Sequence, residues 1–574
     1  MSNYHVKQKG YQTITISDTL LPNGDVDHDK IVIPTILEET HPLHLNNVAD
    51  MSTLDDYYWG KGEVDIKKTT TQPDINNIVN INYAKRAVDN KVPYTFGNPF
   101  SFTLRKDTAN DRKQDQLRAF NDALDNDNYK EKLLSLGMDS AVHRIAHKLF
   151  YPATEKQRKQ GIFFNSQVDL DYHDTYCIYS ADIAKECVMG VNYYTREVYE
   201  QRVETGAYEA IRTETVYNVW TKWHHWVAVA NGVTPPFEWA FERFFVKIND
   251  MNLELEAYPY RIDFDETGNL IPEERTVPLV PFLYRLDRRN AFEDAIPIKN
   301  AIDHLVSLSL DAVQQKTDYI IVLKNISADT EEEREAILSY LRQGILSIKS
   351  NSNSPTQADV DVLDTQLSLT EVNDVITFLK GELEEIINLP NRSGGGQGGS
   401  PTGSGIQYRD GFTSREDEAK LCSSSFEKSE GVCLDVILEM VQEFPECEYR
   451  ELDPTDIGIK ENRNKKENVQ TAAEAYSMLR SAGVSRENAY KISELDPNYV
   501  EMAEADRAEE ERDYEDETKR MIEREKALQK VKPANTANNT NNDSNDANAN
   551  QSSQNSGSNT TVTEEDITVT EESD

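Results

Sequence analysis

The 574-residue chain has little cysteine, no long apolar run and no excess of basic residues. Its five cysteines lie far apart without a Cys-x-x-Cys pair, which argues against a zinc knuckle and favours ordinary buried thiols in a reducing compartment. No stretch of about 18 apolar residues is present, so the sequence predicts no membrane-spanning helix. The polar start of the chain, from Met1 to Gly10, predicts no secretory signal.

The charge balance is strongly acidic, with 61 Lys and Arg residues against 101 Asp and Glu residues and a net charge of −40. Residues 501–574 hold 20 acidic and 8 basic residues, so this tail supplies under a third of the excess and the rest of the chain is acidic too. That composition argues against a protein that wraps DNA with a basic face. It is compatible with a protein that lies close to DNA without binding it tightly.

A glycine-rich segment, Pro390 to Gly411, lies between two long helical patterns. Such a composition is typical of a linker, and here it predicts a mobile loop held at both ends by rigid helices. A phosphate-binding P-loop needs a lysine and a hydroxyl at fixed spacing. The segment contains no lysine, which argues against ATP binding there.

The first half of the chain mixes helical and β patterns. Residues 1–50 combine Pro, Asn and Asp with short apolar runs, and we expect an arm of weak order. Apolar spacings of three and four predict a helix over 75–92, and another helix is expected over 130–149. From Gly161 to Phe282, aromatic and β-branched runs broken by turns predict a β-rich region.

Two helical patterns then bracket a compact insert. The first begins after Pro297, whose missing N–H costs nothing in a first helical turn. The second begins at a Ser368-x-x-Glu371 capping box and ends at Pro390. This order predicts an antiparallel helix pair that carries a module at its tip.

The insert itself, residues 318–368, predicts a small α/β module. It contains a strand at 319–324, a helix with an acidic start after Thr330, a second strand at 344–349 and a polar loop.

A long helix is predicted from Thr413 to about Phe444. Gly431 lies inside it, and an interior glycine costs roughly 1 kcal/mol against alanine, so Gly431 is a candidate for a kink or a close contact. A further helical region is expected over 464–530. Beyond Pro533 the Asn-rich tail lacks the apolar content to fold alone.

Several strings in this order carry a resemblance to a known family. DDYYWGKGEV at 55–64 has paired tyrosines before a Gly-Lys step, and NYAKRAVDNKVPYTFGNPFSF at 82–102 leads a helix into a Tyr-x-Phe-Gly-x-Pro turn. TVPLVPF at 276–282 precedes the helix at 298–314, and YIIVLKN follows at 319–325. Over about residues 50–510 the chain resembles the portal proteins of tailed bacteriophages, particularly those of long-tailed phages of Gram-positive bacteria. The order of the motifs carries the resemblance, because none of them is catalytic.

The resemblance implies an α+β portal fold with a β-rich wing, an antiparallel helical stem, a small α/β clip, a kinked long helix and a helical crown. The implied parts are the N-terminal arm (1–50), wing (51–294), stem helix (295–317), clip (318–368), stem helix (369–390), tunnel loop (391–410), kinked wing helix (411–445), crown (446–532) and disordered acidic, Asn-rich tail (533–574).

It also implies a structural role. Members form a homo-oligomeric ring, a dodecamer, at the unique capsid vertex, and double-stranded DNA passes through it during packaging and ejection. The implied partners are the terminase large subunit, the head–tail connector protein, and the major capsid and scaffolding proteins. We expect the chain in the virion, after assembly in the bacterial host cytoplasm, and we expect no enzymatic activity, metal or cofactor.

A DNA channel should repel phosphate slightly along most of its wall, because otherwise the polymer would stick, and an acidic chain fits that need. The tunnel loop is expected to line the narrowest part of the channel. Its candidate residues are Asn391, Arg392, Gly394, Gly395, Gly396, Gln397, Gly398, Gly399 and Gly403.

Two further sets of residues are candidates. The clip acids would dock the terminase or the connector, or would simply complement the dipole of the helix that they begin. Stem side chains would pack against the partner helix and neighbouring subunits, at roughly 1.5–3 kcal/mol each. The clip acids are Glu331, Glu332, Glu333 and Glu335, and the stem side chains are Ile302, Leu305, Val372 and Leu379.

Other interpretations are weaker. A different connector or minor capsid protein is disfavoured by the bracketed insert and the glycine-rich loop, and a metal-dependent hydrolase finds no distinct acidic triad. His143 and His147 have zinc-ligand spacing on the predicted helix, but Arg144 stands where a metalloprotease motif has Glu, which favours surface histidines. The aromatic group at 220–226 could stack bases, although core or subunit-interface packing is favoured.

Overall fold

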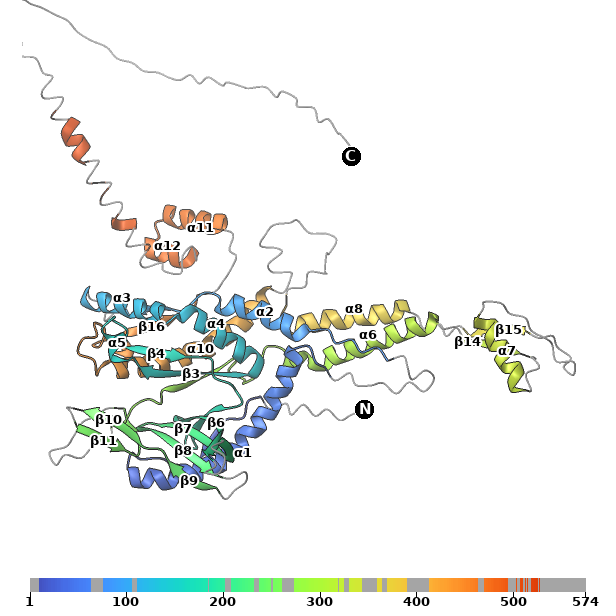
Figure 1. Cartoon of the computed structure of the whole chain (residues 1–574). Helices are drawn as coiled ribbons and strands as arrows, with labels where there is room; N and C mark the ends of the chain where they lie inside the picture. Colours follow the sequence, from blue (N-terminus) through green and yellow to red (C-terminus); the bar gives the residue numbers. More distant parts are fainter. Residues whose placement is uncertain are drawn as a thin grey trace, which may run out of the picture. The chain divides into compact units, whose positions relative to one another are not determined.

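The computed structural model describes residues 10–62, 76–105, 111–183, 185–201, 208–231, 237–248, 251–260, 273–317, 320–324, 330–342, 359–363, 369–389, 412–462 and 469–493, with scattered positions from 502 to 526. The chain divides into two compact units, Met1–Thr471 and Ala472–Asp574. The first unit mixes helices and sheets, which confirms the α+β class (Figure 1).

The larger hydrophobic core of the first unit lies between helices and a small sheet. Here α2 (Tyr83–Phe96), α4 (Tyr129–His143) and α10 (Phe412–Val441) meet strands β13 (Leu279–Leu283), β3 (Ile145–Pro152) and β4 (Phe164–Gln167), which pair in the order β13-β3-β4. The ring of Phe426 on α10 lies 4.2 Å from that of Phe96 and 5.1 Å from that of Phe282. Aromatic packing therefore joins the long helix to both neighbours.

A second core lies between α1 (Val26–Tyr58) and a larger sheet, which confirms the β-rich prediction for this region. Trp226 and Tyr176 are fully buried there. Its strands run in the order β1-β5-β6-β7-β8-β12, with β9 also paired to β8. Their bounds are β1 (Ile14–Ile16), β5 (Thr175–Ser180), β6 (Cys187–Gln201), β7 (Tyr208–Thr221), β8 (His224–Asn231), β9 (Glu238–Phe241) and β12 (Tyr258–Pro259).

Two long helices, α6 (Ile296–Thr317) and α8 (Leu369–Ile386), pack side by side as expected for the bracketing pair (Figure 1). Between them in sequence come β14 (Ile320–Lys324), α7 (Glu331–Arg342) and β15 (Asp359–Leu363), with β14 antiparallel to β15. The expected second strand at 344–349 lies outside the described residues. The strand that pairs with β14 comes instead from the stretch interpreted as a polar loop.

Shorter elements complete the first unit. They are α3 (Asp111–Asn126), α5 (Glu155–Arg158), the pair β2 (Ser101–Leu104) and β16 (Ile457–Lys460), the pair β10 (Phe244–Ile248) and β11 (Met251–Leu255), and the 3-10 turns η1 (Asp18–Leu20), η2 (Glu293–Ala295) and η3 (Pro454–Asp456).

The second unit holds most of α11 (Val469–Ser481) and all of α12 (Arg486–Ser493). The rings of Tyr476 and Tyr490 join the two helices at 4.3 Å. None of the helices that the structure describes combines the length and apolar character needed to cross a bilayer.

Three sequence expectations are wrong. Weak order over residues 1–50 is contradicted by α1, which runs through Pro34 and Pro42 because buried side chains such as Ile33 and Ile36 hold it by tertiary packing. The helix expected over 75–92 begins only at Tyr83, and residues 76–82 before it have no regular secondary structure.

The helix expected over 130–149 ends at His143. Arg144 adopts a left-handed φ of 74°, and the chain continues as strand β3 from Ile145. His143 and His147 therefore do not share a helix face, and the premise of the zinc interpretation is wrong.

Candidate functional site

The stem pair, α6 with α8, is half buried in a single chain. Ile302 is fully buried, Leu379 packs against the main core, and Leu305 and Val372 are partly exposed. These four predicted stem residues thus lie along the two helices that pack together. The start of α6 and the end of α8 are the most deeply buried parts of the pair.

A second face of α6 is covered by residues 76–82, which we call the strap. Alternate backbone N–H groups of the strap donate to side chains one helical turn apart: Asn77 to Asp311 Oδ1 at 2.8 Å, Val79 to Ser307 Oγ at 3.0 Å and Ile81 to Asp303 Oδ1 at 3.0 Å. The three acceptors are at most 3 % exposed. Since buried polar oxygens such as these must find donors, this polar ridge fixes the strap on the stem.

Lys299 lies one turn before the ridge. Its Nζ is 2.6 Å from Asp303 Oδ2, and both side chains are buried. The carboxylate of Asp303 therefore meets an ammonium on one oxygen and the strap on the other.

Several apolar side chains of the stem are exposed. Phe378 is 63 % exposed and Val375 48 % exposed on α8, and Leu308 is 40 % exposed on α6. Within the part of the chain that the structure describes, nothing covers these side chains. An exposed apolar stripe on paired helices is typical of a protein–protein interface.

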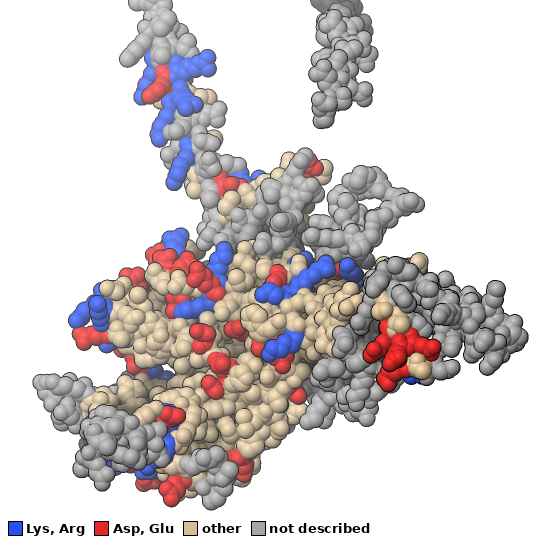
Figure 2. Space-filling model, turned by 45° about the vertical axis from the view of Figure 1, so that its right-hand side comes forward, with Lys and Arg blue, Asp and Glu red and all other residues tan. Residues whose placement is uncertain are grey.

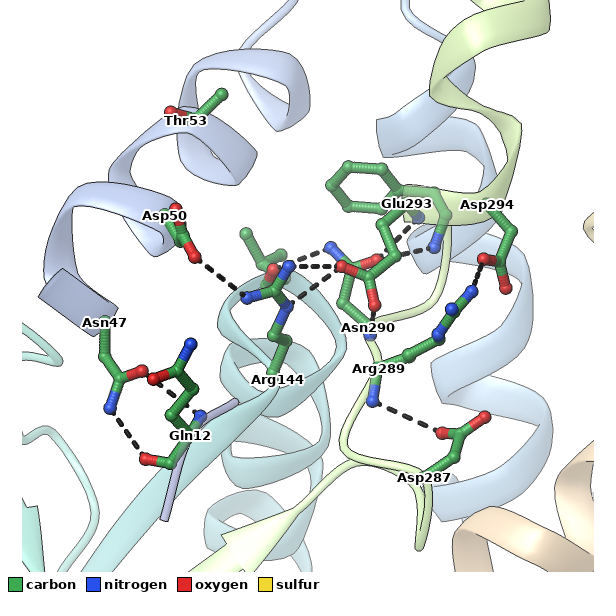
Figure 3. Close-up of polar contacts among 12 residues, drawn as sticks. Gln12, Asn47, Asp50, Thr53, Arg144, Asp287, Arg289, Asn290, Glu293 and Asp294 are labelled. Atoms are coloured by element: carbon green, nitrogen blue, oxygen red, sulfur yellow. Dashed lines mark hydrogen bonds and ion pairs between the residues drawn. The ribbon is translucent and has the colours of Figure 1, made fainter. Parts of the chain in front are cut away.

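The start of α6 is fixed to α4 and α1 through Arg144 (Figure 3). Its guanidinium donates from Nε to Glu293 Oε2 at 2.9 Å and lies 4.0 Å from Asp50 Oδ2 of α1. Asn290 accepts from the backbone N–H of Glu293 and donates to the carbonyl of Val142. The turn that starts the stem is thereby joined to the end of α4.

A buried ion pair holds both ends of the glycine-rich segment. Lys91 on α2 donates to Glu418 Oε1 of α10 at 2.7 Å, and both side chains are at most 6 % exposed. Asn388, just after α8, donates to the other oxygen of Glu418 at 3.2 Å. Burial lowers the pKa of Lys91, and the charge of Glu418 opposes that shift.

The first turns of α10 have further contacts with α2. Tyr94 donates to Glu416 Oε2 at 2.5 Å, and the guanidinium of Arg415 lies over the Tyr94 ring. On the other side of the segment, Arg86 lies 3.3 Å from Glu384 of α8. Helix α2 therefore holds the chain on both sides of residues 390–411. Those residues, including every tunnel-loop candidate from Asn391 to Gly403, lie outside the described residues.

The clip acids begin α7. Figure 2 shows a red patch over this helix, where Glu331, Glu332, Glu333 and Glu335 are all exposed. Glu333 forms a reciprocal cap with Thr330, since its N–H donates to Thr330 Oγ1 and its carboxylate accepts from the Thr330 N–H, each at 3.4 Å. Glu333 thus stabilises the helix start, whereas the other three acids face solvent.

Gly431 lies within a continuous α10. A Cβ at this position would have no neighbouring atom within 4 Å among the described residues, so the prediction of a close contact inside the chain is wrong. The kink at Gly431 remains a prediction. The glycine lines an open groove of about 500 Å³, together with Leu434, Ile457 and Arg105.

The remaining sequence candidates are packed groups. Trp226 is fully buried, and Trp220 stacks on His225 at 5.1 Å, which agrees with the core interpretation. His147 is buried in β3, where burial lowers its pKa to about 3. Among the described residues, no cluster of three His, Cys, Asp or Glu side chains is arranged to hold a metal ion.

Residues 41–518 match the family described as phage portal protein, SPP1 Gp6-like. No curated protein matches the chain.

The buried ion pair leads to a stability prediction. Glu418→Ala leaves the Lys91 ammonium buried without its carboxylate, and we expect a loss of about 3–5 kcal/mol in the free energy of unfolding. Denaturant unfolding of the purified chain measures it. The double variant Lys91→Met/Glu418→Leu removes both charges and should lose much less. Equal losses in the two variants would show that packing, rather than charge, dominates at this position.

Proposed function

The chain belongs to the SPP1 Gp6-like family of phage portal proteins, and from this premise we propose that it forms the ring through which duplex DNA enters and leaves the capsid. The family is structural, so the chain itself acts as a conduit and docking platform. The observation that carries the proposal is the match over residues 41–518, which extends from α1 through the stem and clip to the C-terminal helices. The ring stands at the unique capsid vertex and contacts the major capsid and scaffolding proteins.

We propose that neighbouring subunits of the ring meet at the exposed apolar side chains of the stem. Subunits around a closed ring meet through two different surfaces, one on each side. The exposed side chains Phe378 and Val375 on α8, and Leu308 on α6, supply apolar area that no described segment of the chain covers and that another subunit would cover. A dodecamer repeats this contact at every subunit boundary.

The stem interface is tested by placing a charge in the stripe. We expect Phe378→Asp to weaken subunit association at least tenfold, equivalent to about 1.4 kcal/mol, because the carboxylate would be buried at the contact. Native mass spectrometry and negative-stain microscopy report the subunit number. The control is Phe245→Asp on β10, where the ring is 78 % exposed and outside the stem. Intact rings from Phe378→Asp would refute the stem interface.

The clip is proposed to dock the terminase large subunit during packaging and the head–tail connector afterwards. Support comes from the exposed acids of α7 that the cap does not use, Glu331, Glu332 and Glu335. Rim charges of this kind steer association and set specificity more than they add affinity.

Charge reversal tests the clip surface. Glu332→Lys/Glu335→Lys should slow terminase association and reduce DNA packaging, while ring assembly stays normal. The matched control, Asp122→Lys/Asp125→Lys, reverses two exposed acids on α3. The binding rate should also lose its salt dependence in the clip variant. Normal packaging by the clip variant would leave helix stabilisation as the role of these acids.

Residues 391–410 are proposed to be the tunnel loop. The support is the glycine-rich sequence together with the fixed chain on both sides of it, at Asn388 and Glu418. Glycine-rich backbone between rigid helices can follow a moving duplex at little conformational cost.

Deleting residues 394–399 should impair packaging without affecting ring formation, because the shortened loop no longer reaches the duplex. Replacing the same residues with serine keeps the length and flexibility and is expected to preserve packaging. An in vitro packaging assay with terminase and ATP measures both. If the deletion packaged DNA as well as the serine variant, the loop would have no role at the DNA.

A further inference from the structure

Two of the five cysteines lie on neighbouring strands of the larger sheet. Cys177 is in β5 and Cys187 is at the start of β6, and these two strands pair antiparallel. Cys177 is fully buried, Cys187 is partly exposed, and neither is in a disulfide. Their spacing of ten residues matches no cysteine motif, so only the pairing of the strands brings the two together.

A β-bulge turns Cys187 toward the face of the sheet that holds Cys177. The register is regular up to Ile178, opposite Met189, and then shifts so that Tyr179 pairs with Cys187. In an unshifted register Cys187 would lie opposite the residue after Tyr179. It would then face the other side of the sheet, because side chains alternate along a strand. The extra residue of the bulge therefore re-aims the Cys187 side chain.

The packing on the two faces of the sheet agrees with this register. Cys177 is buried in a small apolar cluster with Leu279 of β13. Tyr179 and Cys187 pack against the same cluster. Met189, two residues after Cys187, lies in the other core, beside α1. The two cysteine side chains thus lie on the same face, diagonally across the pair of strands.

The position directly opposite Cys177 leaves room between the two thiols. It is occupied by Gly190, which has no side chain. A Cβ at Gly190 would lie 2.7 Å from the Cβ of Leu279, so the close approach of β13 requires glycine there. Cys177 Sγ donates to the carbonyl of Leu279 at 3.6 Å and is within hydrogen-bonding reach of the Cys187 thiol. The two sulfur atoms are already neighbours, as a disulfide requires.

We propose that Cys177 and Cys187 are an oxidation site, at which a small-molecule disulfide converts the two thiols into a cross-strand disulfide between β5 and β6. The reduced pair fits a reducing compartment, and the disulfide fits an oxidising one, such as the surroundings of a released virion. The new bond would tie the strands together at the bulge, where their backbone ladder is disrupted. The proposal goes beyond the ring and its partners, and the chemistry of the pair does not depend on them.

The exchange begins at Cys187, because it is the partly exposed member of the pair. Its thiol loses a proton to solvent, and the thiolate attacks one sulfur of the small disulfide, breaks the sulfur–sulfur bond and releases a small thiolate. Cys177 then loses its proton, attacks the Cys187 sulfur and displaces the second small thiolate. Both released thiolates take up protons, and the two electrons of the couple pass from the protein to the reagent.

The second step is expected to be the slow one. Burial raises the pKa of the Cys177 thiol well above its usual range, and the hydrogen bond with Cys187 adds to the rise. Since the thiolate is the nucleophile, a thiol with a raised pKa attacks slowly. A mixed disulfide on Cys187 should therefore form first and then decay as the cross-strand disulfide appears.

The experiment incubates the full-length protein with oxidised glutathione, stops the reaction with acid, unfolds the protein and blocks the remaining thiols with an alkylating reagent. Lys185 lies between the two cysteines, so trypsin separates them, and mass spectrometry detects the disulfide as a linked pair of peptides. Incubation with reduced glutathione should leave both peptides alkylated and unlinked. The variant Cys187→Ser should lose the linked pair altogether.

The control variant is Cys447→Ala, which removes a buried thiol after α10 and should form the linked pair as the unaltered protein does. That pattern supports the proposal. A lasting glutathione adduct on Cys187 with Cys177 unlinked, or two unreacted thiols, overturns it. Equally frequent links to Cys422 or Cys433 also overturn it, because they would show that unfolded chains are oxidised. Native mass spectrometry of the same samples reports ring assembly separately, so failure of the disulfide would leave the portal role standing.

Discussion

The buried contact between Lys91 and Glu418 is the constraint on which the middle of the structure depends. An ammonium and a carboxylate that are both removed from water need each other and their hydrogen-bond partners in fixed positions. Around this pair the chain brings together α2, the turn before the stem through the carbonyl of Ala291, the end of α8 through Asn388, and the start of α10. Segments more than 300 residues apart are thereby held at one point.

The stem shows how one helix can serve several purposes. One face of α6 packs on α8, a second accepts the strap on a polar ridge, and a third exposes apolar side chains such as Leu308. The first two contacts are complete within a chain and fix the orientation of the helix. The third leaves apolar side chains exposed, and in the proposed ring a rigidly oriented helix would present them without further ordering, which lowers the entropic cost of association.

The sequence predicts the helices and strands correctly where the apolar periodicity is strong. It predicts them incorrectly where tertiary contacts determine the secondary structure. The stem helices and the clip helix follow from their apolar spacing and first-turn residues. Helix α1 was missed because Pro34 and Pro42 are strong local signals against a helix, and burial of Ile33 and Ile36 outweighs them. The helix after residue 130 was extended too far, because an apolar run such as that of β3 fits a strand as well as a helix.

The site was predicted less completely than the fold. The order of the sequence patterns predicts the helix pair and its insert. The strap cannot be predicted from its own residues, because it binds α6 through backbone N–H groups, which every residue except proline has. A signal did exist in the sequence of α6, since Asp303, Ser307 and Asp311 repeat at intervals of four residues along this helix. The contribution of Glu333 to a cap could be read from Thr330-x-x-Glu333, whereas the roles of Glu332 and Glu335 depend on a partner.

The strap has a geometric consequence. Two residues of extended chain advance about 6.6 Å, whereas four residues of α-helix rise about 6.0 Å. Each successive bond between a fully extended strap and the ridge would therefore fall out of step by about 0.6 Å, which bending of the strap and rotation of the acceptor side chains can absorb. The ridge from Asp303 to Asp311 spans two such steps. Over these two steps the mismatch would add up to about 1.2 Å, so a much longer ladder of the same kind would lose its register.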